Sequence, residues 1–209
     1  MKNNSYIVAS LGRCGSQLMT EAIHNHVWGF LDHPKPLLSK TRPFIREYPE
    51  DFKNGTVYKT HLYPTKFPSN CKVIFTFGDP LDIVLSVLRK SRDPRWGPAH
   101  FANLGADWND FPKIMQQDVL NLENMFDAFY KKQEFDIMCA RYETLWDHES
   151  EISNFLGFDF KMPEKIERTS NKQRKLLSED TLIAFEKGYS SLNKKINDAE
   201  NLKTWSNKK

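Results

Sequence analysis

The chain has 209 residues, and its 30 basic and 27 acidic side chains give a formal net charge of +3 at pH 7. This length is enough for one domain, residues 1–209, whose core needs neither disulfides nor metals. Because the two signs of charge are interspersed, the composition argues against a broad nucleic-acid surface. We therefore expect a single domain that has no nucleic-acid partner.

The cysteines and the first ten residues indicate the cellular compartment of the protein. The chain has an odd number of cysteines and no C-x-x-C pair; the three are Cys14, Cys71 and Cys139. This pattern is typical of reduced thiols in a cytoplasmic protein. The stretch MKNNSYIVAS contains no apolar run long enough for a signal peptide or a membrane anchor. We expect a cytoplasmic location and no membrane partner.

The first predicted elements are a buried strand over 6–9 and a helix through 18–23, joined by a glycine-flanked loop around Arg13. Because the N–H groups of a helix's first turn have no partner inside the helix, such a loop is suited to hold a phosphate or sulfate. Arg13 adds a full positive charge. The same residues also fit a plain connection in which Gly12 and Gly15 supply positive φ and nothing binds.

Other known anion loops do not fit this stretch. A nucleotide-triphosphate loop requires Lys after its second glycine, and no Lys follows Gly15, so ATP or GTP binding of that type is disfavoured. A dinucleotide fingerprint requires a further glycine beyond Gly12 and Gly15. A cysteine phosphatase needs Arg six residues after Cys14, where this chain has Thr20. The loop is predicted to hold a phosphate or sulfate in another way.

Two further strands follow a Pro-rich stretch over 32–52, which we predict to be a loop with a short helical piece. The segment 56–64 is predicted to form the second strand, and the continuous apolar run CKVIFTF forms a third strand that is buried on both faces. That strand stops at Gly78, and Asp79 is suited to cap a helix over 80–91.

Residues 93–111 are rich in Pro, Gly, Trp and Asn and are predicted to form a surface loop or lid. Aromatic side chains in this segment either cover a sugar or a flat ring of a substrate or pack on the core. They are Trp96, His100, Phe101, Trp108 and Phe111.

The remaining elements complete an alternation of strands and helices. An amphipathic helix is predicted over 113–131, followed by a fourth strand over 135–145. Gly157 closes the next helix and Ser178 begins the last one, after which the polar tail 198–209 is predicted to fray. This alternation predicts a central parallel sheet flanked by helices, in which ligands bind beyond the carboxyl ends of the strands.

Lys59 and His61 come at the end of the second predicted strand. They lie two residues apart, so both side chains are on the same side of the extended chain. Lys59 is suited to neutralise a transferring anion, while His61, with an ordinary pKa of about 6.5, is suited to take a proton from an attacking hydroxyl. The alternative is a packed histidine beside a solvated lysine.

Five stretches in this order, RCGSQLM, YKTH, KVIFTFGDPLDIVLSVLR, ARYETL and EISNFLGF, resemble the motif set of the PAPS-dependent sulfotransferases. PAPS is 3′-phosphoadenosine 5′-phosphosulfate, the sulfuryl donor of that family, and PAP is the product left after transfer. The resemblance covers residues 6–158. It implies a P-loop NTPase-like sulfotransferase fold and transfer of a sulfuryl group to a hydroxyl or amine of a small-molecule or glycan acceptor, without a metal.

The resemblance also implies roles for individual residues. His61 would be the catalytic base, and Lys59 would contact the sulfuryl oxygens. Ser86 would bind the 3′-phosphate, and Tyr142 would lie by the adenine. The loop that would hold the 5′-phosphosulfate consists of Arg13, Cys14, Gly15, Ser16, Gln17 and Leu18.

The chain departs from the family pattern at both phosphate sites. Gly78 stands where the family has its 3′-phosphate arginine. Two residues are predicted to replace that arginine: Arg89, or Arg174, which lies in the run SNKQRK. Cys14 stands where the family loop has a hydroxyl, beside Arg13 at a helix N-terminus, an environment that lowers the pKa of a thiol. Cys14 is either a redox site or a small residue in a tight turn. A second interpretation of the whole chain is a noncatalytic PAP- or anion-binding module whose 3′-phosphate site has decayed.

Overall fold

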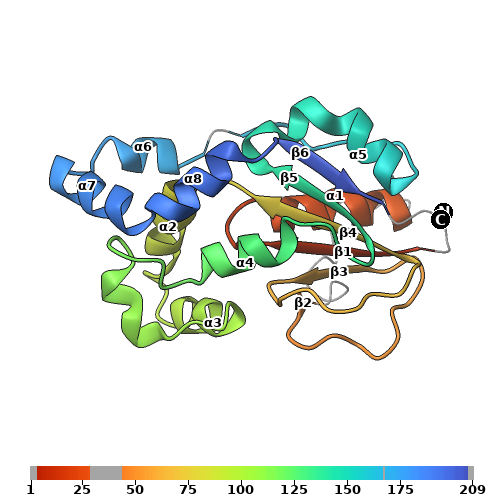
Figure 1. Ribbon diagram of the computed structural model, residues 1–209, viewed down its shortest axis with the longest axis horizontal. Helices are drawn as coiled ribbons and strands as arrows, with labels where there is room; N and C mark the ends of the chain where they lie inside the picture. Colours follow the sequence, from red (N-terminus) through yellow and green to blue (C-terminus); the bar gives the residue numbers. More distant parts are fainter. Residues whose placement is uncertain (1–3, 29–43, 167, 207–209) are drawn as a thin grey trace.

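The computed structural model describes residues 4–28, 44–166 and 168–206, and its strands form one sheet in the order β2-β3-β1-β4-β5-β6 (Figure 1). From β2 to β5 neighbouring strands run parallel, whereas β6 runs antiparallel to β5. The expected α/β domain with a central parallel sheet flanked by helices is confirmed, apart from this antiparallel edge strand. The strands are β1 (Ser5–Ser10), β2 (Phe44–Ile45), β3 (Val57–Thr60), β4 (Cys71–Phe77), β5 (Asp136–Arg141) and β6 (Leu202–Trp205).

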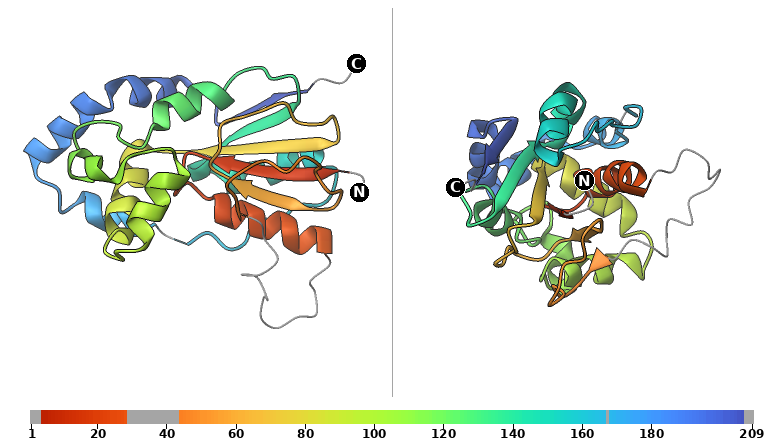
Figure 2. Two further views of the ribbon diagram at one scale, coloured as in Figure 1. Left: turned by 90° about the horizontal axis from the view of Figure 1, so that it is seen from below. Right: turned by 90° about the vertical axis from the view of Figure 1, so that its right-hand side faces the viewer.

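Helices cover both faces of this sheet and also gather at one end of it. The helices are α1 (Ser16–Trp28), α2 (Pro80–Lys90), α3 (Trp96–Asn103), α4 (Leu122–Phe129), α5 (Glu149–Leu156), α6 (Ser170–Arg174), α7 (Glu179–Gly188) and α8 (Ser190–Asp198), with 3-10 helices over Trp108–Lys113 and Tyr142–His148. One face is covered by α1 and α5, and the other by α4 and α8 (Figure 2). Beyond the carboxyl ends of the parallel strands lie α2, α3, α6 and α7.

Each face of the sheet has its own apolar core. Ile7 and Phe75 belong to the core on the side of α4, while Tyr6, Val8 and Ile74 belong to the core on the side of α1 and α5. Because both faces are covered, every residue of β1 is buried. The two central strands, β1 and β4, therefore show continuous apolar runs in the sequence rather than the alternation of a half-exposed sheet.

The predicted helix ends are confirmed by their capping contacts. The carboxylate of Asp79 accepts a hydrogen bond from the backbone N–H of Asp82 at 3.0 Å, and Pro80 begins α2. Gly157 closes α5 with a left-handed φ of 85°. The hydroxyl of Ser178 caps α7 in the same way as Asp79 caps α2.

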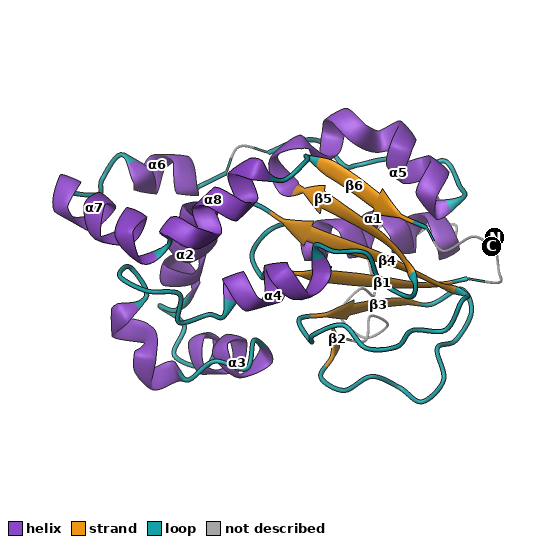
Figure 3. Cartoon of the chain, in the orientation of Figure 1, coloured by secondary structure: helices purple, strands orange, loops and turns teal. Residues whose placement is uncertain are grey.

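Two segments between β4 and β5 differ from the prediction. The expected loop over 93–111 contains α3 and the 3-10 helix Trp108–Lys113 (Figure 3). The expected helix over 113–131 forms only as α4, because Asn121 has a left-handed φ of 57°. The carboxylate of Asp118 accepts hydrogen bonds from the N–H groups of the first two residues of α4, at 3.0 and 2.8 Å. These contacts start a new helix in the middle of the amphipathic pattern.

The tail predicted to fray over 198–209 instead contains β6. Leu202 packs against one core and Trp205 against the other, while the backbone pairs with β5. Apolar contacts on both faces and backbone pairing with β5 thus hold this polar stretch on the sheet. The loop predicted over 32–52 lies partly outside the described residues. No helix in the described part of the chain is long and apolar enough to cross a membrane.

Candidate functional site

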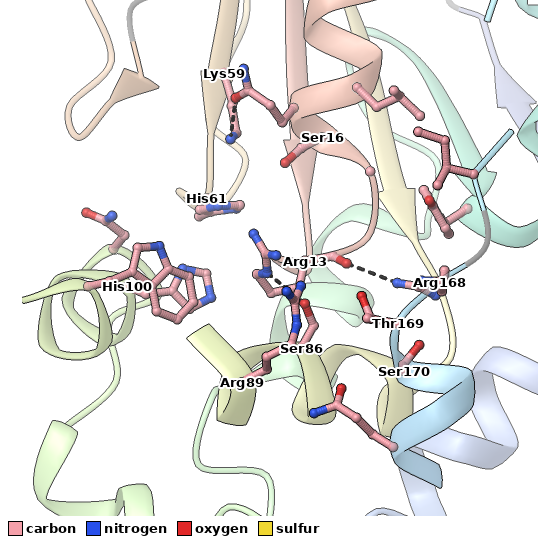
Figure 4. Close-up of a pocket in the computed structure, with 18 of the residues that line it drawn as sticks. Arg13, Ser16, Lys59, His61, Ser86, Arg89, His100, Arg168, Thr169 and Ser170 are labelled. Atoms are coloured by element: carbon pink, nitrogen blue, oxygen red, sulfur yellow. Dashed lines mark hydrogen bonds between the residues drawn. The ribbon is translucent and has the colours of Figure 1, made fainter. Parts of the chain in front are cut away.

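A cavity of about 480 Å³ lies at the carboxyl ends of β1 and β3, and residues of α1, α2, α3 and α6 contribute to its walls (Figure 4). It brings together residues from segments that are far apart in the chain, as expected for a parallel sheet. Of the predicted site residues, Cys14 and Arg174 are not part of its lining. Those that line it are Arg13, Gly15, Ser16, Gln17, Leu18, Lys59, His61, Ser86, Arg89 and Tyr142.

The loop between β1 and α1 is shaped by left-handed backbone at Gly12, Arg13 and Gly15, whose φ angles are 81°, 54° and 85°. At Gly15 the adjacent space is also filled, because a Cβ there would lie 2.3 Å from Cδ2 of Tyr142. Both the backbone angle and the close ring therefore require glycine. The loop leads into the first turn of α1, where N–H groups lack partners inside the helix and Ser16 lines the cavity.

Arg13 is held from several sides. Its Nε donates a hydrogen bond to Ser86 Oγ at 3.0 Å, and its guanidinium lies 5.5 Å from the ring centre of Trp96. Its backbone carbonyl accepts a hydrogen bond from Nη2 of Arg168 at 3.0 Å. Burial, together with the nearby Arg89, lowers the pKa of Arg13 from its usual value. Since a guanidinium stays charged in proteins, Arg13 is a fixed positive charge at the cavity.

Lys59 and His61 both face the cavity, as their spacing predicts. The Lys59 ammonium donates a hydrogen bond to Oε1 of Gln17 at 3.0 Å. The amide nitrogen of Gln17 in turn donates to Glu21 at 2.7 Å. Gln17 thus positions the lysine beside the first turn of α1.

His61 is buried, and its Nδ1 lies 3.2 Å from both the carbonyl oxygen and the Oγ of Ser10. Because a carbonyl oxygen only accepts, the neutral ring carries its proton on Nδ1 and its lone pair on Nε2. Burial, reinforced by the Lys59 cation, lowers the pKa of His61 to about 4. The expectation of an ordinary pKa is therefore wrong, and His61 is a neutral base at neutral pH.

Helix α3 brings to the cavity an imidazole for which the sequence leaves two alternatives open, contact with a substrate or packing on the core. His100 is buried, stacks on Trp96 with ring centres 4.4 Å apart, and meets His61 edge to face at 5.7 Å. Burial, together with the neighbouring His61, lowers the pKa of His100 to about 3. Trp96 and His100 line the cavity, whereas the other aromatic residues of 93–111 pack against the core. The four-residue spacing of Trp96 and His100 is one helical turn, a signal that the interpretation of this segment as a loop hides.

The Cys14 side chain belongs to the core rather than to the cavity. It is fully buried, and its Sγ donates a hydrogen bond to the carbonyl oxygen of Thr76 at 3.0 Å. Burial raises the pKa of Cys14 to about 11, which contradicts the lowered pKa expected beside Arg13. Cys14 is thus a small residue packed beneath the loop, and its environment does not favour redox chemistry.

No space for a side chain remains at position 78, where the resemblance places the family's 3′-phosphate arginine. A Cβ on Gly78 would lie 2.8 Å from Oε1 of Glu143, and the same oxygen accepts a hydrogen bond from Nη1 of Arg168 at 2.8 Å. Arg174, one of the predicted substitutes, binds two carboxylates at the start of α2 and does not line the cavity. The prediction that Arg174 faces a ligand is therefore corrected: its charge is used inside the protein.

Arg89, the other predicted substitute, lines the cavity together with Ser170 and Gln173 of α6. Among the described residues, Arg89 Nε, Ser170 Oγ and Gln173 Oε1 are buried without a hydrogen-bond partner. Buried polar atoms are normally paired, so this end of the cavity is suited to a polar ligand. The run SNKQRK pointed to this region, but which of its side chains face the cavity depends on how α6 packs.

No known family model matches this chain, and a search of curated proteins finds none similar to it. Within the described residues, no group of three or more His, Cys, Asp or Glu side chains is placed to hold a metal ion. An interpretation of function therefore rests on the geometry of the cavity.

Proposed function

We propose that this protein is a sulfotransferase of the P-loop NTPase-like fold, which moves a sulfuryl group from PAPS to a hydroxyl or amine of a small molecule or glycan. The observation that carries the proposal is the meeting of His61, Lys59 and the Arg13 loop at one cavity. These are the residues to which the resemblance assigns the chemistry. The unpaired state of the buried cysteines supports the proposed cytoplasmic location.

In the proposed reaction the acceptor oxygen or nitrogen forms a bond to sulfur, the bond from sulfur to the 5′-phosphate oxygen breaks, and PAP leaves with that electron pair. Nε2 of His61 takes the acceptor's proton, since the neutral ring has the required lone pair at neutral pH. The negative charges of bound PAPS would raise the pKa of His61 towards the operating pH, where a general base works best. Lys59 and Arg13 stabilise negative charge on the sulfuryl and bridging oxygens, where charge gathers in a loose in-line transition state. The first-turn N–H groups of α1 hold the 5′-phosphate.

Arg89 is our candidate for the cation that replaces the missing 3′-phosphate arginine. It follows Ser86 by one turn of α2, and both line the cavity. Ser170 and Gln173 add buried polar atoms that have no partner among the described residues. Tyr142, with the Arg168 guanidinium 4.3 Å from its ring centre, supplies a wall for the adenine.

A second candidate function is a PAP- or anion-binding module that performs no transfer. The closure of Gly78 by the Glu143 carboxylate favours it, because that carboxylate fills the space where the family's arginine would lie. In that case the cavity would bind PAP without using His61 as a base.

Two measurements on the intact protein separate these functions. Calorimetry with PAP and with ATP reports on binding, and transfer of radiolabelled sulfate from PAPS to a panel of hydroxyl and amine acceptors reports on catalysis. We expect binding of PAP in preference to ATP and label on at least one acceptor class. PAP binding without transfer to any acceptor supports the module, whereas binding of ATP alone contradicts both.

A further inference from the structure

One face of α3 forms the wall of the cavity beside His61. Trp96, His100 and Asn103 follow one another at spacings of four and three residues and all line the cavity. In Figure 4, His100 and His61 lie side by side, away from Arg168, Thr169 and Ser170 on the other side. If PAP occupies the end at Ser170, the acceptor lies against the wall that the two imidazoles form.

His100 presents an atom that the protein itself does not use. Its Nε2 is buried and has no hydrogen-bond partner among the described residues. The ring is held by its stacking on Trp96 and by the loop, since a Cβ on Gly12 would lie 3.3 Å from the same nitrogen. A buried polar atom in a fixed ring at a cavity wall is suited to bond a ligand group.

We propose that His100 binds a second hydroxyl of the acceptor, next to the hydroxyl that attacks, so that the acceptor is a vicinal diol. The inference rests on the proposed function, in which His61 takes the proton of the attacking hydroxyl. Because the two rings are in edge-to-face contact at 5.7 Å, groups that bond to both come from neighbouring positions of one molecule. A lone hydroxyl that gives its proton to His61 leaves the Nε2 of His100 without a partner. The Asn103 amide lines the same wall.

Matched acceptor pairs test this directly. Catechol is compared with phenol, and cis-1,2-cyclohexanediol with cyclohexanol, by kcat/KM with PAPS in the wild type, His100→Phe and His100→Gln. We expect the wild type to prefer the diol of at least one pair by about tenfold or more, since a site built to bond a hydroxyl rejects analogues that lack it. The pair that shows the preference tells an aromatic diol from a saturated, sugar-like one.

His100→Phe keeps a ring to stack on Trp96 but removes the nitrogen, so the preference should fall below about threefold through a higher KM for the diol. His100→Gln keeps a hydrogen-bonding group and should retain most of the preference. Equal rates within both wild-type pairs, or a preference that persists in His100→Phe, would overturn the inference while leaving the transfer reaction intact.

The two proposals fail in distinguishable ways. If the wild type transfers no sulfate from PAPS, the proposed function is wrong. Calorimetry of the same four compounds with the protein in the presence of PAP then decides the role of His100 without turnover. Tighter binding of a diol that His100→Phe abolishes supports the assignment, and equal binding of diol and mono-ol contradicts it.

Discussion

Burial has opposite consequences for two reactive side chains beside the loop after β1. For His61 it lowers the pKa to about 4 and so leaves a neutral ring at neutral pH. For Cys14 it raises the pKa to about 11 and so leaves an inert thiol. The sequence predicts the identity and spacing of such residues, but it does not show their burial, which depends on how α3 and β4 close around them. This is why the predicted pKa values were wrong at both positions.

Gly15→Ala tests the close packing of the loop against Tyr142. A left-handed φ alone costs roughly 1–2 kcal/mol for an alanine, and the Cβ would also lie 2.3 Å from Cδ2 of Tyr142. We expect a loss of about 2–4 kcal/mol in the free energy of unfolding, measured in urea, since overpacking adds to backbone strain. PAP affinity should fall at least about tenfold because the phosphate loop must move.

Gly55→Ala is the matched control for this substitution. Gly55 has a similar φ of 73°, but a Cβ there would meet nothing within 4 Å. It should lose only about 1–2 kcal/mol and keep its PAP affinity. Equal losses at the two glycines, with PAP binding intact in both, would contradict the account of the loop.

Among the elements, the packing of α6 on α2 decides which arginine reaches the cavity. Arg89 and Arg174 are both candidates in the sequence, Arg89 because it follows Ser86 by one helical turn and Arg174 because it lies in the basic run SNKQRK. The structure separates them, because Arg174 turns to the carboxylates of Asp79 and Asp82 while Arg89 lines the cavity. Side-chain direction of this kind follows from contacts between elements and could not be predicted from one sequence.

Arg89→Ala and Arg174→Ala should therefore act on different properties. Loss of Arg89 should weaken PAP binding by about 1.5–3 kcal/mol, roughly ten- to a hundredfold in Kd, the range for hydrogen bonds to charged groups. Loss of Arg174 should leave PAP affinity within about twofold but lower the free energy of unfolding, because the buried Asp82 loses a partner. Calorimetry and urea unfolding of both variants check this, and unchanged PAP affinity in Arg89→Ala would contradict the assignment.

Asp118→Ala tests why the long predicted helix is interrupted. The carboxylate caps the start of α4 through two backbone N–H groups, at 3.0 and 2.8 Å. Its loss should lower the free energy of unfolding by about 1 kcal/mol, the usual value of a helix cap. Asp118→Asn keeps one oxygen acceptor and should lose less. Urea unfolding that ranks the two variants the other way round would exclude this explanation.

For the whole molecule, simple topology accounts for much of the site. Continuous apolar runs predict the parallel strands, and the rule for their carboxyl ends brings Arg13 to Ser86 across 73 residues of sequence. Two features depend on long-range packing. The sequence missed β6, whose few apolar side chains find a place only on the finished sheet, and it left open whether His100 faces a substrate or packs on the core.

The two buried imidazoles make the fold sensitive to acid. Each titrates near 6.5 in the unfolded chain, whereas the fold lowers the pKa to about 4 for His61 and to about 3 for His100. Below pH 6.5 the unfolded chain thus binds more protons than the folded protein. The free energy of unfolding therefore decreases as the pH is lowered, by up to ~1.4 kcal/mol per pH unit for each imidazole. Urea unfolding between pH 7 and 5 should show this slope, and His100→Phe should reduce it. An identical slope in the variant would contradict the burial of a neutral His100.

The central claim is that His61 is the base of a sulfuryl transfer for which the rest of the cavity binds PAPS. Its most direct test is a single-turnover assay of His61→Ala with radiolabelled PAPS, combined with calorimetry of PAP on the same sample. We predict that transfer falls at least about a hundredfold, the usual contribution of a general base, while the Kd for PAP changes by less than about twofold. Turnover near the wild-type rate with PAP still bound would contradict the claim.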